Sequence, residues 1–233
     1  MAMTVSEMLD FFRGQIQRSQ RGMDAAKSTG IYPLAELNCR QSFKCRLMIS
    51  LIEWRNGIDP SNSLSEVAAG FADDWAKVVA VGGDKAKTTN VPAERLAFVV
   101  YLIGKPCFID VSSDGLEGDR LLDLVLGDWL FDSWNGKLWE NGMAQLRRAG
   151  SDLAVRTYEL YKTIIDAAGS DVTALSHEGE RLFAKRKSDA FFCGGDQTEG
   201  GGNDNNVTID YRLAALLKRS GFHDASGVHV WKW

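Results

Sequence analysis

Residues 32–57, YPLAELNCRQSFKCRLMISLIEWRNG, contain the strongest structural pattern in the sequence. Apolar side chains recur from Cys39 to Trp54 at spacings of four, four, four and three residues, which places them on one face of an α-helix. Pro33 suits the first turn of such a helix, and Asn56-Gly57 is a typical helix end. Further apolar residues widen the stripe, so we predict a central helix: Met48, Ile49 and Ile52.

The same helical periodicity continues on both sides of this segment and predicts the fold class. Ser63 and Glu66 fit a capping box at the start of the next helix. There is no series of β-hairpins and no linker rich in Pro and Ser. We predict an all-α, single-domain bundle of roughly eight helices over residues 1–233, with a possible subdivision into 1–90 and 91–233. The other predicted helices lie near residues 6–27, 63–81, 92–103, 114–131, 151–168, 171–187 and 209–219.

The composition is that of a globular protein in a reducing compartment. The 233 residues are 45% hydrophobic and 25% charged, and the net charge of -4 argues against a general nucleic-acid binder. The N-terminus lacks the order of a signal peptide, and the apolar run 96–103 is too short to cross a bilayer. Four cysteines without a C-x-x-C pair favour reduced thiols. We therefore predict a cytoplasmic protein without a membrane span.

Charge is unevenly distributed along the chain. Residues 57–145 contain seven basic and 14 acidic residues, a net charge of -7, whereas residues 1–56 have a net charge of +3. An acidic segment can attract a basic partner, because opposite fields steer association. The alternative is a solvated acidic surface without a partner.

The stretch 194–206, GGDQTEGGGNDNN, is the most polar and glycine-dense part of the chain. Gly195 and Gly200 have the spacing of a phosphate-binding loop, but Gly201 and Gly202 stand where such a loop needs Lys and Ser or Thr. The order of acidic residues also differs from that of a calcium-binding EF-hand. We predict a solvated connection before the last helix; the alternative is a segment that orders on a partner.

No catalytic motif stands out. The three histidines are scattered, and no G-x-S-x-G occurs. Asp119 and Asp123 are four residues apart, hence on one helical face, and such carboxylates can hold a metal or transfer protons. Because no Glu-x-x-His motif accompanies them, a di-metal site has little support. A metal-dependent enzyme that uses Asp119, Asp123 and Asp128 is therefore one alternative function, and a helical scaffold or regulator is another. We predict no catalytic residue, metal or cofactor.

Residues 128–139, DWLFDSWNGKLW, place three tryptophans beside Asp128 and Asp132. Aromatic residues next to charges are typical of interface hot spots. The other interpretation is a core corner, where two helices meet at Asn135-Gly136.

Three segments resemble a family of helical immunity proteins, which protect bacteria from their own polymorphic nuclease toxins. The first is Leu51–Ile58, LIEWRNGI, which has the aromatic-x-x-Gly turn that ends the family's N-terminal helix pair. The second is Asp119–Leu126, DRLLDLVL, which is similar to the family's Asp- and Leu-rich middle helix. The third is Asp210–Gly221, DYRLAALLKRSG, which is similar to its C-terminal helix.

The resemblance implies an immunity protein of a type VI or contact-dependent secretion system. Such a protein binds a cognate toxin and occludes its active or substrate-binding site, without chemistry of its own. Because nucleases are usually basic, an acidic surface would speed capture. The residues predicted to bind the toxin are Asp110, Asp114, Glu117, Asp119, Asp123, Asp128, Asp132, Trp134, Asp196 and Glu199.

Overall fold

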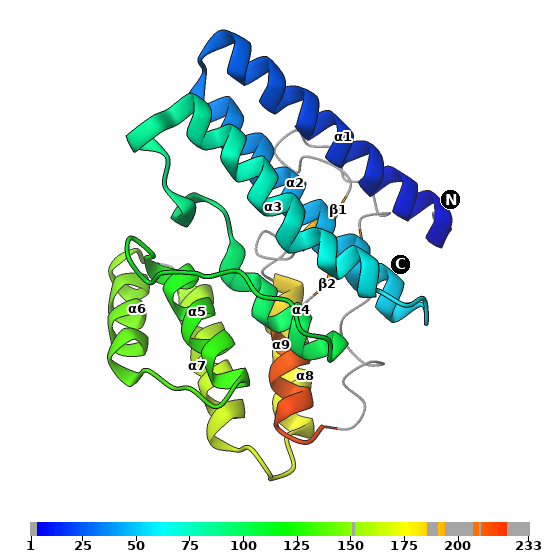
Figure 1. The fold of residues 1–233 in the computed structure, drawn as a ribbon. Helices are drawn as coiled ribbons and strands as arrows, with labels where there is room; N and C mark the ends of the chain where they lie inside the picture. Colours follow the sequence, from blue (N-terminus) through cyan, green and yellow to red (C-terminus); the bar gives the residue numbers. More distant parts are fainter. Residues whose placement is uncertain (1–3, 151, 186–190, 194–206, 210, 223–233) are drawn as a thin grey trace. The chain divides into compact units, whose positions relative to one another are not determined.

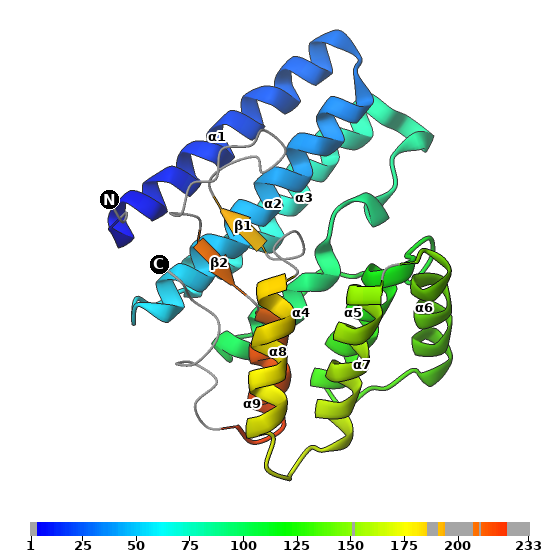
Figure 2. The same ribbon diagram turned by 180° about the vertical axis from the view of Figure 1, so that it is seen from behind.

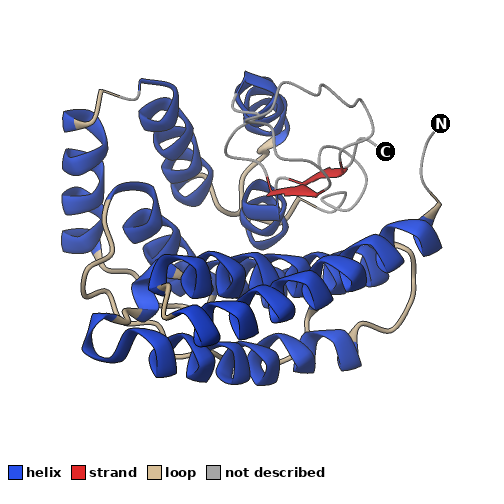
Figure 3. Ribbon diagram, turned by 90° about the horizontal axis from the view of Figure 1, so that it is seen from above, coloured by secondary structure: helices blue, strands red, loops and turns tan. Residues whose placement is uncertain are grey.

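The computed structural model describes residues 4–150, 152–185, 191–193, 207–209 and 211–222. The protein is all-α, as predicted, and these ranges contain nine α-helices (Figure 1). Helices account for most of the described chain in Figure 3 as well. The helices are α1 (Val5–Thr29), α2 (Tyr32–Arg55), α3 (Ser61–Gly82), α4 (Leu96–Ile103), α5 (Gly118–Leu130), α6 (Gly136–Arg148), α7 (Asp152–Asp166), α8 (Thr173–Lys185) and α9 (Tyr211–Arg219).

The chain forms two compact units. Unit 1 comprises Met1–Leu96 and Lys105–Asp114, and unit 2 comprises Ala97–Gly104 and Gly115–Trp233. The single domain over residues 1–233 stays a prediction.

Unit 1 is built on α1, α2 and α3, with α2 packed against both of the others. Leu47, Met48 and Leu51 of α2 are each 1% exposed or less, which confirms that this helix is central. Pro33 lies in its first turn, and Gly57 follows it with a φ of 71°, as its sequence predicts. The repeating apolar pattern therefore folds as a helix because both of its neighbours cover it.

The capping interactions of unit 1 differ from the prediction. α3 begins at Ser61, so Ser63 lies inside the helix, and its hydroxyl donates to the buried Glu53 carboxylate at 2.5 Å. The predicted capping box at Ser63 is therefore wrong, because a carboxylate of α2 binds its hydroxyl. A capping box occurs instead at the start of α1, where Thr4 and Glu7 bond to each other's backbone N–H.

Unit 2 contains most of α4 and all of α5 to α9. α5 packs against α6, and α7 contacts α6, α8 and α9. α8 and α9 lie side by side, as Figures 1 and 2 show. Close approach of α5 and α6 requires Gly142, because a Cβ there would lie 2.8 Å from Leu122 Cγ.

The glycine-rich stretch 194–206 lies outside the described residues. Two short strands, β1 (Phe191–Cys193) and β2 (Val207–Ile209), flank it and pair antiparallel, with Phe191 opposite Ile209. In the described chain this stretch therefore follows one strand and precedes the other, and both strands lie between α8 and α9 in the sequence. None of the described helices combines the length and the apolar character that crossing a bilayer requires.

Candidate functional site

The interior of unit 2 contains a buried ion pair between α5 and α9. Nη1 of Arg212 lies 3.2 Å from each carboxylate oxygen of Asp123, and the two residues are 5% and 0% exposed. The hydroxyl of Tyr158, on α7, donates to Asp123 Oδ1 at 2.8 Å and accepts from Arg212 at 3.2 Å. This network joins three helices through groups that water does not reach.

The network keeps both charges paired. Burial alone would lower the pKa of Arg212, but the charge of Asp123, together with smaller contributions from Tyr158, Tyr161 and Tyr211, holds the pKa well above its usual value. A buried ion pair adds little net stability, yet removing one partner is costly because the other charge stays buried. The role of these residues is therefore structural.

The position of Asp123 corrects two predictions. A side chain with no exposed area cannot contact a partner of the folded protein, so its assignment to the binding surface is wrong. It is also neutralised by Arg212, which removes it from a carboxylate site for a metal. Among the described residues, no three His, Cys, Asp or Glu side chains lie close enough to hold a metal ion.

The turn between α5 and α6, residues 131–135, has an unusual backbone. Asp132 has a φ of 67°, the one positive value at a non-glycine residue in the described part of the chain. Its N–H donates to the carbonyl of Trp129, and the N–H of Ser133 donates to that of Asp128. These two bonds form a Schellman motif, in which glycine usually occupies the position of Asp132.

Arg219, the last residue of α9, holds this turn in place. Its Nη1 donates to the carbonyl oxygen of Leu130 at 2.6 Å, and its Nη2 lies 2.6 Å from Asp132 Oδ1. The guanidinium also lies over the ring of Trp129, with Cζ 4.7 Å from the centroid. Three interactions of one side chain thus fix a turn whose backbone is disfavoured for aspartate.

The turn exposes two large aromatic side chains. Phe131 is 53% exposed and Trp134 is 38% exposed. The centroid of the Trp134 ring lies 5.3 Å from that of Trp139, and Nζ of Lys162 lies over the Trp134 ring, 5.5 Å from its centroid. Trp139 is buried, which agrees with the core-corner interpretation, whereas for the partly exposed Trp134 the interface interpretation stays a prediction. Rigid, half-exposed aromatic rings next to an arginine are typical of interface hot spots.

The structure brings only some of the predicted binding residues together. Asp132 and Trp134 share the α5–α6 turn, and the backbone carbonyl of the half-buried Asp128 accepts hydrogen bonds from the N–H groups of Phe131 and Ser133. Burial raises the pKa of Asp128 above its usual value. The exposed Asp110 and Asp114 belong to unit 1, whereas Glu117 and Asp119 belong to unit 2; Asp196 and Glu199 lie outside the described residues.

Sequence reasoning did not find Arg212 and Arg219. Arg212 is 89 residues from Asp123, and Arg219 is 87 residues from Asp132, so no local spacing reveals either pair. The signal available was indirect: two arginines seven residues apart lie near one face of α9.

Comparison of the chain with family models, with curated proteins and with solved structures gives no match.

Proposed function

We propose that this protein binds a partner protein through the α5–α6 turn and that the partner is a secreted bacterial toxin, which it neutralises. The observation that supports binding is the turn itself. Phe131 and Trp134 are exposed, and Arg219 fixes the backbone that presents them. Preorganised aromatic side chains lose little conformational entropy on binding, so they yield affinity efficiently.

The partner meets both apolar and charged groups at this turn. Trp134 offers ring surface for a pocket, and the Asp132 side chain, 88% exposed, offers a carboxylate to a basic group. The choice of a toxin is supported by the order of the three segments similar to immunity proteins. That order also supports inhibition by occlusion, which needs a rigid surface and no catalysis.

Site-specific photo-crosslinking in the native host tests this proposal. A photoreactive benzoylphenylalanine replaces Trp134, and a matched control carries it at Leu37, which is 58% exposed on α2 in unit 1. We expect a crosslinked product from position 134 that is absent from position 37. The captured protein is then expressed with and without this chain.

The two parts of the proposal fail separately. Equal crosslinking at both positions would contradict binding through the turn. A specific partner that does not harm cells when expressed alone would contradict the toxin while leaving the binding surface intact. Toxicity that co-expression of this chain relieves would support both.

A further inference from the structure

Unit 1 includes an extended segment that belongs to no helix, residues 105–114, KPCFIDVSSD. It is bracketed by Gly104 and Gly115, whose φ angles of 74° and 75° lie in the left-handed region. These two glycines allow the chain to turn sharply where the segment begins and ends. Between them the residues have neither helical nor strand hydrogen bonds.

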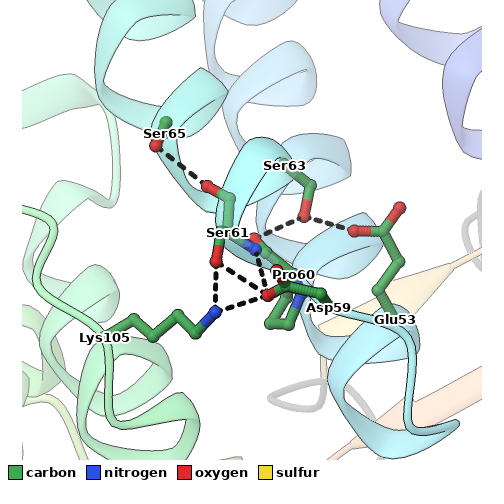
Figure 4. Close-up of polar contacts among 7 residues, drawn as sticks. All are labelled: Glu53, Asp59, Pro60, Ser61, Ser63, Ser65 and Lys105. Carbon is green, nitrogen blue, oxygen red and sulfur yellow. Dashed lines mark hydrogen bonds and ion pairs between the residues drawn. The ribbon is translucent and has the colours of Figure 1, made fainter.

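Side-chain contacts hold the start of the segment on unit 1. Lys105 Nζ contacts the carboxylate of Asp59 and the hydroxyl of Ser61, at the start of α3 (Figure 4). The hydrogen bond from Lys105, followed by those from Ser61, lowers the pKa of Asp59 to about 2. The thiol of Cys107 donates to the carbonyl oxygen of Leu64 at 3.3 Å.

Exposure alternates along the segment with the period of a β-strand. Residues with even numbers from 106 to 114 are exposed, and those with odd numbers from 105 to 113 are partly buried. Phe108 is 81% exposed, the highest value among the large exposed hydrophobic residues of the described chain. Asp110 and Asp114 follow on the same exposed side.

The backbone of the segment is unpaired. Within the described chain, residues 106–113 make no backbone–backbone hydrogen bond; one side-chain contact, from Asp114 N–H to Ser112 Oγ at 3.1 Å, closes its end. An extended chain whose N–H and C=O groups make no backbone–backbone hydrogen bond resembles the edge of a sheet, which readily pairs with another strand. Recognition of extended peptides commonly uses this type of pairing.

We propose that residues 105–114 form a docking site for a basic, extended segment of a partner protein, which pairs with this backbone as an added strand. Asp110 and Asp114 supply the charge complementarity, and Lys105 is occupied by Asp59. Phe108 packs against an apolar side chain of the added strand. A second copy of the chain is disfavoured, because it would place these aspartates against one another. This surface lies in unit 1 and is independent of the α5–α6 turn.

Amide hydrogen exchange of the full chain tests the proposal. The probe is a short peptide of alternating lysine and valine, which favours an extended conformation and carries positive charge. We expect every second amide of residues 108–113, those that face the added strand, to exchange at least about fivefold more slowly at saturating peptide. An analogue with N-methyl groups on alternate amides keeps the charge but cannot pair, and should leave exchange unchanged.

Variants of exposed residues complete the test without threatening the fold. Asp110→Asn with Asp114→Asn should weaken peptide binding and its dependence on salt, and Phe108→Ala should weaken binding at all salt concentrations. Equal binding of the N-methylated analogue, or unchanged exchange at 108–113 at saturation, would overturn the proposal. Protection that rises with protein concentration without peptide would also overturn it, in favour of self-pairing.

Discussion

Two arginine–aspartate pairs connect α9 to the α5 region of unit 2, and they differ in how far their side chains are exposed to water. Arg212 and Asp123 lie inside the unit, 5% and 0% exposed, whereas the side chains of Arg219 and Asp132 are 22% and 88% exposed. The inner pair is completed by Tyr158 and reaches no surface. The outer pair fixes a turn that exposes Phe131 and Trp134.

The comparison shows that α9 has two roles: Arg212 stabilises the interior of unit 2, and Arg219 fixes the α5–α6 turn. Loss of one partner from a buried pair leaves an uncompensated buried charge, so the stability of the fold depends on both Asp123 and Arg212. An exposed pair contributes at most about 1 kcal/mol to stability. We infer that the outer pair serves mainly to orient the aromatic side chains around it.

The largest predicted effect is on the inner pair. Asp123→Asn removes the negative charge beside the buried Arg212, and we expect the free energy of unfolding to fall by about 3–5 kcal/mol. The matched control is Asp132→Asn, which should cost less than about 1 kcal/mol. Urea denaturation of both variants measures the contrast. Equal losses of unfolding free energy would show that burial does not make the two pairs contribute differently to stability.

The packing of α5 on α6 positions the α5–α6 turn, and a substitution at Gly142 tests this packing. Gly142→Ala places a Cβ 2.8 Å from Leu122 Cγ. Overpacking costs about 1–3 kcal/mol, more than the roughly 1 kcal/mol that alanine gains in helix propensity. We expect a lower melting temperature. Gly14→Ala, on α1 with no neighbouring atom within 4 Å, should instead raise it, and a stabilised Gly142→Ala would contradict the close approach of these helices.

The backbone of the outer turn gives a smaller effect. Asp132→Gly removes the strain of a φ of 67° but also the contact with Arg219. Because these contributions oppose each other, the free energy of unfolding should change by less than about 1 kcal/mol. Affinity for the captured partner should nevertheless fall, since the turn loses one of its three interactions with Arg219 and keeps only those with Leu130 and Trp129. A variant that binds as tightly as the unaltered protein would show that the contact between Asp132 and Arg219 is dispensable for binding.

A third pair, Lys105 and Asp59 of unit 1, is also exposed, with side chains 40% and 70% accessible, and should matter little to stability. The pKa of Asp59 is lowered from 3.8 to about 2, first by the hydrogen bond from Lys105 and then by Ser61. The ionised carboxylate therefore favours the folded state above pH 3.8, and this contribution disappears as the pH falls towards 2. Carboxyl titration by NMR should show the Asp59 pKa rising towards its usual value in Lys105→Met. An unchanged pKa would show that Lys105 does not bind the carboxylate of Asp59 in solution.

The helices were readable from the sequence because their determinants are local. The apolar repeat from Cys39 to Trp54 and the turn at Asn56-Gly57 correspond directly to α2 and its end. The capping box predicted at Ser63 was wrong because the hydroxyl of Ser63 binds Glu53, which belongs to another helix. The α6 helix was expected only as the far side of the corner at Asn135-Gly136, where it does begin.

The candidate site was only partly readable, because tertiary contacts decide which acidic residues are exposed. Asp119 to Asp132 looked like one acidic surface, but Arg212 draws Asp123 into the interior and Arg219 pairs with Asp132. Trp134 and Trp139 have the same residue type and neighbouring positions, yet only one is exposed. Helical spacing alone does not distinguish them, since their burial depends on α7 and its Tyr158 and Lys162.

The central claim is that the α5–α6 turn is a binding surface. The most direct measurement is the dissociation constant of Trp134→Ala for the partner captured at that position, beside the control Leu37→Ala. The account predicts an increase of at least about thirtyfold for Trp134→Ala, with the protein still folded, and no change for the control. A change of less than about threefold for Trp134→Ala would contradict it.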